Sequence, residues 1–158
     1  MIEVRTCLWF AKDAEAAVRF YTAIVPGSGI ENIQRAVTTW PGGEPGDVIV
    51  INFHLGDQKY MALNGGTKAE YGFAASISVQ CETQDQVDSL WDQLKSQGGE
   101  EIQCGWVRDR WGIPWQVVPE ILPRLLSNSD PAVVARVFDA MVNMIKLDSA
   151  ALEAAAAG

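Results

Sequence analysis

The sequence predicts an α+β fold made of two βαβββ modules with curved, mixed sheets, followed by helices at the C-terminal end. Three observations predict it. Strand-like segments flank two amphipathic helical segments. The order of one strand, one helix and further strands occurs twice. After residue 120, the apolar residues keep helical spacing alone. We therefore divide a single domain, residues 1–158, into modules at 1–66 and 72–120 and a helical extension at 121–158.

The first module begins with a strand at 4–10, which is rich in β-branched and aromatic residues. Asp13 is the predicted N-cap of the helix that follows, and Pro26 with Gly27 stops that helix. A Gly-Asp hairpin turn then separates two of the remaining strands. Those remaining strands are predicted at 30–39, 47–55 and 59–64.

The second module repeats this order. Its first strand is predicted at 74–80, and Thr83 with Gln86 forms a capping box at the start of the next helix. Gly98 and Gly99 stop the helix. Further strands are predicted at 100–107 and 115–118, joined by a turn at 109–112.

A shift of 70 residues superimposes the two helical patterns. It matches the predicted caps and three apolar positions of each stripe, as the pairs Asp13 and Thr83, Ala17 and Val87, Tyr21 and Trp91, and Ile24 and Leu94. The repeat is visible in pattern more than in identity, as expected for diverged halves. The alternative is coincidence between two ordinary amphipathic helices.

The extension begins with Asp130 as a cap and Pro131 at the first helical position. Asp148 starts a short final helix rich in alanine. The main helix carries one apolar stripe, formed by Val134, Val137, Phe138, Met141 and Ile145. This stripe needs a surface to cover it, and we expect a homodimer, although packing within one chain would also satisfy it.

Composition limits the partners. The net charge of −8 argues against nucleic acid and against anionic membrane surfaces. No apolar stretch approaches the length of a membrane span. Three cysteines, with no CxxC pair and no signal-peptide pattern, indicate reduced thiols and a cytoplasmic location. We expect a small-molecule ligand, with no nucleic-acid or membrane partner.

Several segments are similar to one known group of proteins. The chain resembles the bacterial-type PhnB-like branch of the vicinal-oxygen-chelate (VOC) superfamily, which has the glyoxalase/bleomycin-resistance/dioxygenase fold. This branch is often labelled 3-demethylubiquinone-9 3-methyltransferase-like. The segments are CLWFAKDAEAAVRFY at 7–21, ALNGG at 62–66, SISVQCETQDQVDSLW at 76–91, CGWVRDRWGIPWQVVP at 104–119 and the tail at 130–153.

The resemblance implies where ligands would lie. In metal-dependent VOC proteins, the first and last strands of each module supply them. The matching positions here are Thr6 on the first strand, Ala62 or Asn64 on the fourth, Ser76 with its neighbour Ser78 on the fifth, and Gln116 on the eighth. Divalent cations prefer carboxylate or imidazole ligands over neutral oxygens. We therefore expect no bound metal and no cofactor. The Gly-rich loop that usually binds S-adenosylmethionine is also missing.

What remains is a polar cup that orients a small molecule by hydrogen bonds. The predicted ligand-binding residues are Thr6, Asn64, Ser76, Ser78, Trp106 and Gln116. Trp106, Trp111 and Trp115 could form its aromatic wall, or could pack in the core. Equally, the polar groups could satisfy one another.

Two other functions stay open: an enzyme (lyase, isomerase, dioxygenase or, by label alone, methyltransferase) and an interaction domain that docks through its C-terminal helices. Three further residues have ordinary structural interpretations. We expect His54 to be an edge histidine, Asp109 to form a surface ion pair and Cys104 to be an inert thiol.

Overall fold

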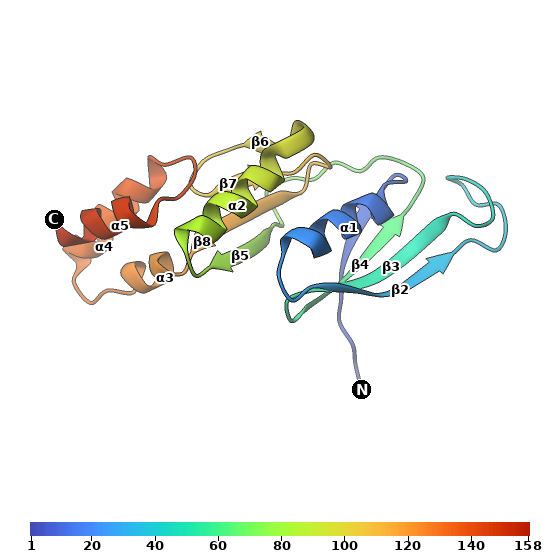
Figure 1. The fold of residues 1–158 in the computed structure, drawn as a ribbon, viewed down its shortest axis with the longest axis horizontal. Coiled ribbons are helices and arrows are strands. Elements are labelled where there is room, and N and C mark those ends of the chain that lie inside the picture. The colour runs from blue at the N-terminus through green and yellow to red at the C-terminus, as the bar shows by residue number, and fades with distance from the viewer. The chain divides into compact units, whose positions relative to one another are not determined.

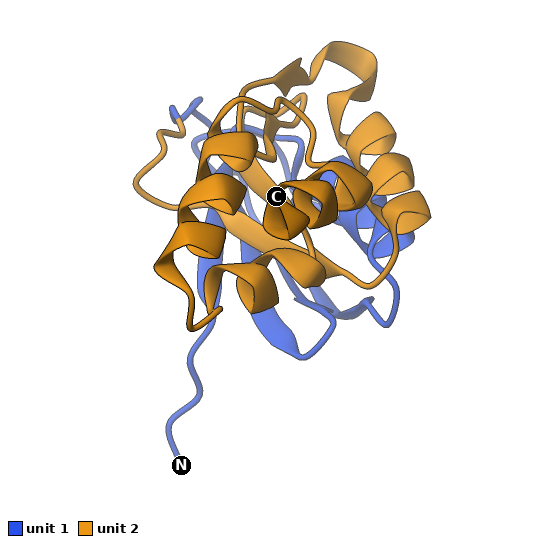
Figure 2. Cartoon of the chain, turned by 90° about the vertical axis from the view of Figure 1, so that its left-hand side faces the viewer, with its two compact units in different colours: residues 1–70 blue, residues 71–158 orange.

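A computed structural model describes residues 1–158, and the chain divides into two compact units, Met1–Glu70 and Tyr71–Gly158 (Figure 2). Each unit contains a four-stranded mixed sheet with one long helix across one of its faces (Figure 1). This arrangement confirms the predicted α+β class with two βαβββ modules. The second unit also carries the C-terminal helices.

The first unit follows the predicted element order. Its elements are β1 (Thr6–Phe10), α1 (Ala14–Ile24), β2 (Gly29–Arg35), β3 (Val48–Leu55) and β4 (Gln58–Asn64). The strand order in the sheet is β1-β4-β3-β2. β1 runs parallel to β4, and the other neighbouring pairs are antiparallel. The first and last strands of the module therefore lie side by side.

One face of this sheet is buried under α1, and the other is not. Side chains alternate between the two faces of a strand. On β1, Leu8 and Phe10 are buried, whereas Cys7 and Trp9 lie on the opposite face. The buried face meets the apolar side of α1, which consists of Ala14, Ala17, Val18 and Tyr21.

The second unit has the same plan. Its elements are β5 (Ile77–Cys81), α2 (Gln84–Lys95), a 3₁₀ turn (Ser96–Gly98), β6 (Glu100–Glu101), β7 (Trp106–Arg108) and β8 (Pro114–Pro119). The strand order is β5-β8-β7-β6, with β5 parallel to β8. α2 buries its apolar side, which consists of Val87, Leu90, Trp91 and Leu94.

The strand predicted at 100–107 is interrupted, because the chain turns between β6 and β7. Cys104 and Gly105 have φ values of 55° and 80°, a region that strands do not use. Their N–H groups donate to the carbonyls of Met144 and Ile145, each at 2.8 Å. A side chain at Gly105 would also meet Leu147. The C-terminal segment therefore takes the hydrogen bonds that a continuous strand would have used.

Three helices complete the second unit: α3 (Ile121–Leu126), α4 (Pro131–Val142) and α5 (Ser149–Ala157). Asp130 and Asp148 cap α4 and α5 as predicted, by accepting hydrogen bonds from Ala132 N and Ala151 N. The helices enclose their own apolar cluster, which consists of Leu122, Val137, Leu147 and Leu152. No helix in the chain is both long and apolar enough to span a bilayer.

The two long helices begin in different ways. The capping box predicted for α2 is present, with Thr83 and Gln86 bonded to each other's backbone. The side chain of Asp13, by contrast, makes no capping bond. Asn64 replaces it: its Oδ1 accepts from Ala14 N at 3.0 Å, and its Nδ2 donates to Val48 O at 2.9 Å. The start of α1 is thus capped from β4.

We predict that Asn64→Ala destabilises the protein by about 1–3 kcal/mol, because it leaves Ala14 N and Val48 O without their buried partner. Asp13→Ala should change stability by no more than about 0.5 kcal/mol, since its side chain makes no capping bond. Urea denaturation of both variants measures the difference. Equal losses in the two variants would contradict the assignment of the cap to Asn64.

Candidate functional site

The second sheet has one face under α2 and one face without a covering helix from this unit. Ile77 and Trp115 are buried toward α2. Because neighbouring residues alternate between faces, Ser78 and Gln116 lie on the other side. We call this side the open face of the second sheet, and it consists of Ser76, Ser78, Trp106, Arg108 and Gln116.

Gln116 is at the centre of the open face. The strand register places it between Ser78 on β5 and Trp106 on β7. Its Nε2 donates to Ser76 Oγ at 2.8 Å, and the side chain is half-buried. Four of the six predicted site residues therefore come together on one sheet face. A primary amide here presents both donors and an acceptor.

The other two predicted residues, Thr6 and Asn64, lie in the first unit and on the opposite kind of face. Thr6 is in register with the buried Tyr60, and it precedes Leu8 on the face under α1. Asn64 is buried at the end of β4. It borders a cavity of about 370 Å³, but the hydrogen bonds to α1 and β3 occupy both ends of its side chain.

A difference of one residue explains this separation. Two residues, Ala11 and Lys12, connect β1 to the first residue of the α1 cap, whereas Glu82 alone connects β5 to Thr83. The helices therefore match at a shift of 70 residues, but the strands match at 71. A slip of one residue moves a side chain to the opposite face. Thr6 is thus the counterpart of Ile77, and Cys7 is the counterpart of Ser78.

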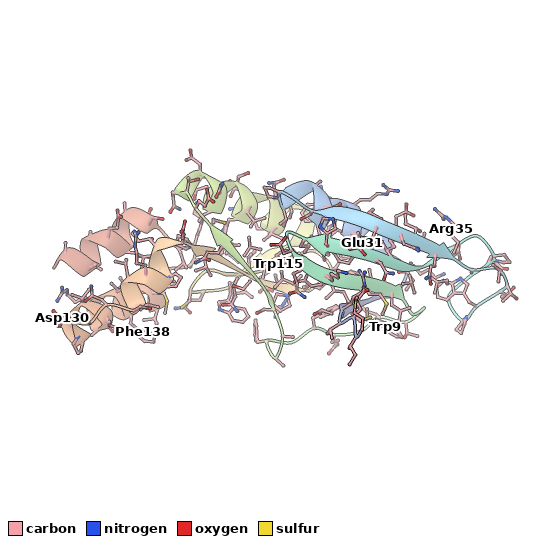
Figure 3. The ribbon with its side chains drawn as sticks, turned by 90° about the horizontal axis from the view of Figure 1, so that it is seen from below. Trp9, Glu31, Arg35, Trp115, Asp130 and Phe138 are labelled. Atoms are coloured by element: carbon pink, nitrogen blue, oxygen red, sulfur yellow. The ribbon has the colours of Figure 1, made fainter.

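Only one of the three tryptophans considered for the aromatic wall lies on the open face. Trp106 is there, half-buried beside Gln116. Trp115 is completely buried and packs under α2 (Figure 3). Trp111 lies in the β7–β8 turn, where the guanidinium of Arg110 stacks on its ring at 4.1 Å. The predicted wall is therefore reduced to Trp106 on this face.

Asp109 is not the surface residue that the sequence suggested, because it is only 2% exposed. Its Oδ1 accepts from the N–H groups of Trp111 and Ile113 at 2.9 and 3.0 Å, and its Oδ2 accepts from Trp115 Nε1 at 2.9 Å. The carboxylate thus shapes the turn between β7 and β8. An aspartate that precedes a turn glycine is typical of such side-chain-to-backbone bonding, and this signal was present in the sequence.

Sequence reasoning missed Phe73 and Arg108. The Phe73 ring meets Trp106 edge-on, with centroids 5.8 Å apart and planes at 83°. The Arg108 guanidinium lies 5.1 Å from the centre of the same ring. Arg108 also pairs with Glu100 at 3.1 Å. The alternation of β7, which puts Trp106 and Arg108 on one face, is the signal that could have found Arg108.

The side chains of the open face do not fit a divalent metal. They offer two hydroxyls and one amide, and no three His, Cys, Asp or Glu residues of the chain are grouped to hold an ion. On the first sheet, burial raises the pKa of the Cys7 thiol. A protonated thiol is a poor ligand. His54 lies near a hairpin turn, where its Nδ1 is 3.0 Å from Gly56 O.

Known proteins share this architecture. A PhnB protein from Bacillus cereus is 31% identical, and 75% of this chain matches 99% of that chain with a TM-score of 0.66. Protein PA1353 from Pseudomonas aeruginosa is 19% identical over 76% of this chain and 98% of its own, with a TM-score of 0.60. The fosfomycin resistance protein FosX from Listeria monocytogenes is 12% identical over 75% and 94%, with a TM-score of 0.50. Among curated proteins, nothing matches the chain.

Two βαβββ units with these sheet orders define the VOC class, the fold of glyoxalase and bleomycin-resistance proteins. A family model described as 3-demethylubiquinone-9 3-methyltransferase matches residues 2–118. The chain belongs to this family, as its PhnB-like relative also indicates. Helices α3 to α5 lie outside the matched residues.

We predict that Asp109→Ala lowers the free energy of unfolding by about 3 kcal/mol, because three buried donors lose a charged acceptor. Near-ultraviolet circular dichroism should also change, since Trp115 loses its partner. Arg110→Ala is the matched control, because Arg110 belongs to the same turn but is outside the carboxylate's hydrogen bonds. A change of less than about 1 kcal/mol for Asp109→Ala would contradict the structural role.

Proposed function

We propose that this protein binds a small organic molecule on the open face of its second sheet. The observation that carries the proposal is the row formed by Ser78, Gln116 and Trp106 across three neighbouring strands. Hydroxyl and amide groups orient a ligand by hydrogen bonds, and an indole offers a flat apolar surface. Binding sites commonly combine an apolar wall with a few polar groups that fix orientation.

An enzyme is the alternative, and the family's description names a methyltransferase. No residue of the row is an acid, a base or an activated nucleophile, the groups on which general acid–base and covalent catalysis depend. The contacts of the open face therefore support binding more directly than any particular reaction. A test of catalysis would begin with S-adenosylmethionine, whose binding isothermal calorimetry would detect.

The direct test of the binding proposal is native mass spectrometry of the protein purified from its own cells, combined with metal analysis. We expect a retained small molecule and no stoichiometric metal. Zinc, nickel or manganese at one ion per chain, lost when Ser78 and Gln116 are replaced, would overturn the metal-free site. The three free cysteines support a reducing compartment such as the cytoplasm as the place to isolate it.

We predict that Gln116→Ala weakens binding of the retained molecule by about 0.5–1.5 kcal/mol, the value of one neutral hydrogen bond. Stability should change little, because Gln116 is half-buried and water can replace its amide. Gln116→Glu should still not bind a divalent ion tightly, since one carboxylate among neutral groups is a weak site.

The matched control is Gln58→Ala. Gln58 is an exposed glutamine in the β3–β4 hairpin, and it should leave affinity unchanged. If Gln116→Ala leaves affinity unchanged and lowers the melting temperature instead, Gln116 is a structural residue and the site assignment is wrong.

We also propose that the protein is a homodimer. The apolar stripe of α4 is covered only in part by its own chain: Val137 is buried, but Phe138 and Ile145 are 50% and 52% exposed. Figure 3 shows Phe138 projecting from α4. Val134, Phe138 and their neighbours also border an open, mainly apolar hollow of about 600 Å³. A second copy covering this face would remove apolar surface from water.

We predict that Phe138→Glu produces a monomer, because the substitution places a charge in the apolar hollow. Sedimentation velocity at micromolar concentration measures the change. Val37→Glu is the control, because Val37 is exposed but lies far along the chain from α4. A monomer already in the unmodified protein would refute the proposal.

A further inference from the structure

The open face of the second sheet contains one cation, Arg108. It follows Trp106 by two residues on β7, so both side chains lie on the same side of the sheet. Pro114 on β8 is in register with Arg108, and Gln116 is in register with Trp106. Gln116 is therefore two residues from the position beside Arg108. A molecule of modest size that contacts Gln116 and Trp106 also reaches the guanidinium.

The guanidinium is only partly used by the protein. Its Nη1 donates to Glu100, whose side chain is 67% exposed. Exposed ion pairs of this kind are weak and exchange readily with solvent. Arg108 Nε, by contrast, is sealed from water and has no hydrogen-bond partner. Buried donors are almost always paired in folded proteins, so this one indicates an acceptor that the isolated chain does not supply.

Phe73 covers this donor. It lies in the turn that precedes β5, and its ring contacts both Trp106 and Arg108. The ring is nevertheless 56% exposed. A phenyl group that remains largely in water, while it occupies the surface between an indole and a guanidinium, is held weakly. It stands where the flat part of a ligand would make the same contacts.

We propose that the ligand of the open face is a planar organic acid. Its acidic group pairs with Arg108 and uses the Nε edge, where a guanidinium binds a carboxylate or sulfonate through two parallel hydrogen bonds. Its flat body stacks on Trp106 and displaces Phe73. This inference rests on the function proposed above and adds the chemical class of the ligand.

Two fluorescent probes test the charge requirement: anilinonaphthalene sulfonate, and phenylnaphthylamine, which has the same aromatic body without the sulfonate. Fluorescence titration should show that the unmodified protein binds the acidic probe about tenfold more tightly than the neutral one. Trp106→Ala should weaken both probes, and this locates them on the open face.

The variants of Arg108 separate charge from packing. Arg108→Gln should abolish the preference for the acidic probe, and Arg108→Lys should keep part of it, because lysine retains the charge but not the paired donors. Arg110→Gln is the matched control: its guanidinium stacks on Trp111 in the turn, and its loss should change neither probe. Urea midpoints of all variants verify that they fold.

Replacement of the neighbours should have the opposite sign. Phe73→Ala should tighten both probes about two- to fivefold, because less protein must be displaced, and Glu100→Gln should tighten the acidic probe alone, because it removes a competing carboxylate. Packing roles alone would make every one of these variants weaker.

The outcomes distinguish the two proposals. Equal affinity for both probes, unchanged in Arg108→Gln, overturns the planar-acid inference and leaves binding at Gln116 intact. Weaker binding of both probes in Phe73→Ala also overturns it, because Phe73 would then be part of the binding surface. The proposed function itself fails if neither probe binds and Gln116→Ala does not affect the retained molecule.

Discussion

The buried carboxylate of Asp109 determines the geometry of the second unit more than any other single group. A charge in a protein interior is unfavourable unless hydrogen bonds compensate it. Here two backbone N–H groups and the indole of Trp115 do so. The same bonds set the turn between β7 and β8, and this turn fixes the register that places Trp106 opposite Gln116. The open face is thus a consequence of one satisfied charge.

Much of the fold could be predicted from the sequence, because it depends on local patterns. The periodicity of α1 and α2, the Thr83 capping box and the caps at Asp130 and Asp148 are all encoded within a few residues. The failures involve distant partners. Asp13 has the identity of a cap, but Asn64 supplies the bond from another strand. No reading of the residues near Asp13 could have revealed this.

The candidate site illustrates the same limit. Ser76, Ser78, Trp106 and Gln116 could be predicted together, because strand alternation and the resemblance to VOC proteins agree in the second unit. Thr6 was assigned to the site by a shift that is correct for the helices and wrong by one residue for the strands. Such a difference is invisible in an apolar pattern, yet it exchanges the two faces of a sheet. Phe73 lies in an irregular turn, where no periodicity applies.

The hydrogen bonds from Cys104 and Gly105 to the segment after α4 have a dynamic consequence. Their amide hydrogens can exchange with solvent only when α4 and α5 detach from the turn that leads into β7. Proteins open in cooperative units of this kind, with a free energy particular to each unit. Because Trp106 directly follows that turn, release of the C-terminal helices would also loosen the strand that carries the indole. The family match ends before these helices, but their local stability sets how rigidly the binding face is held.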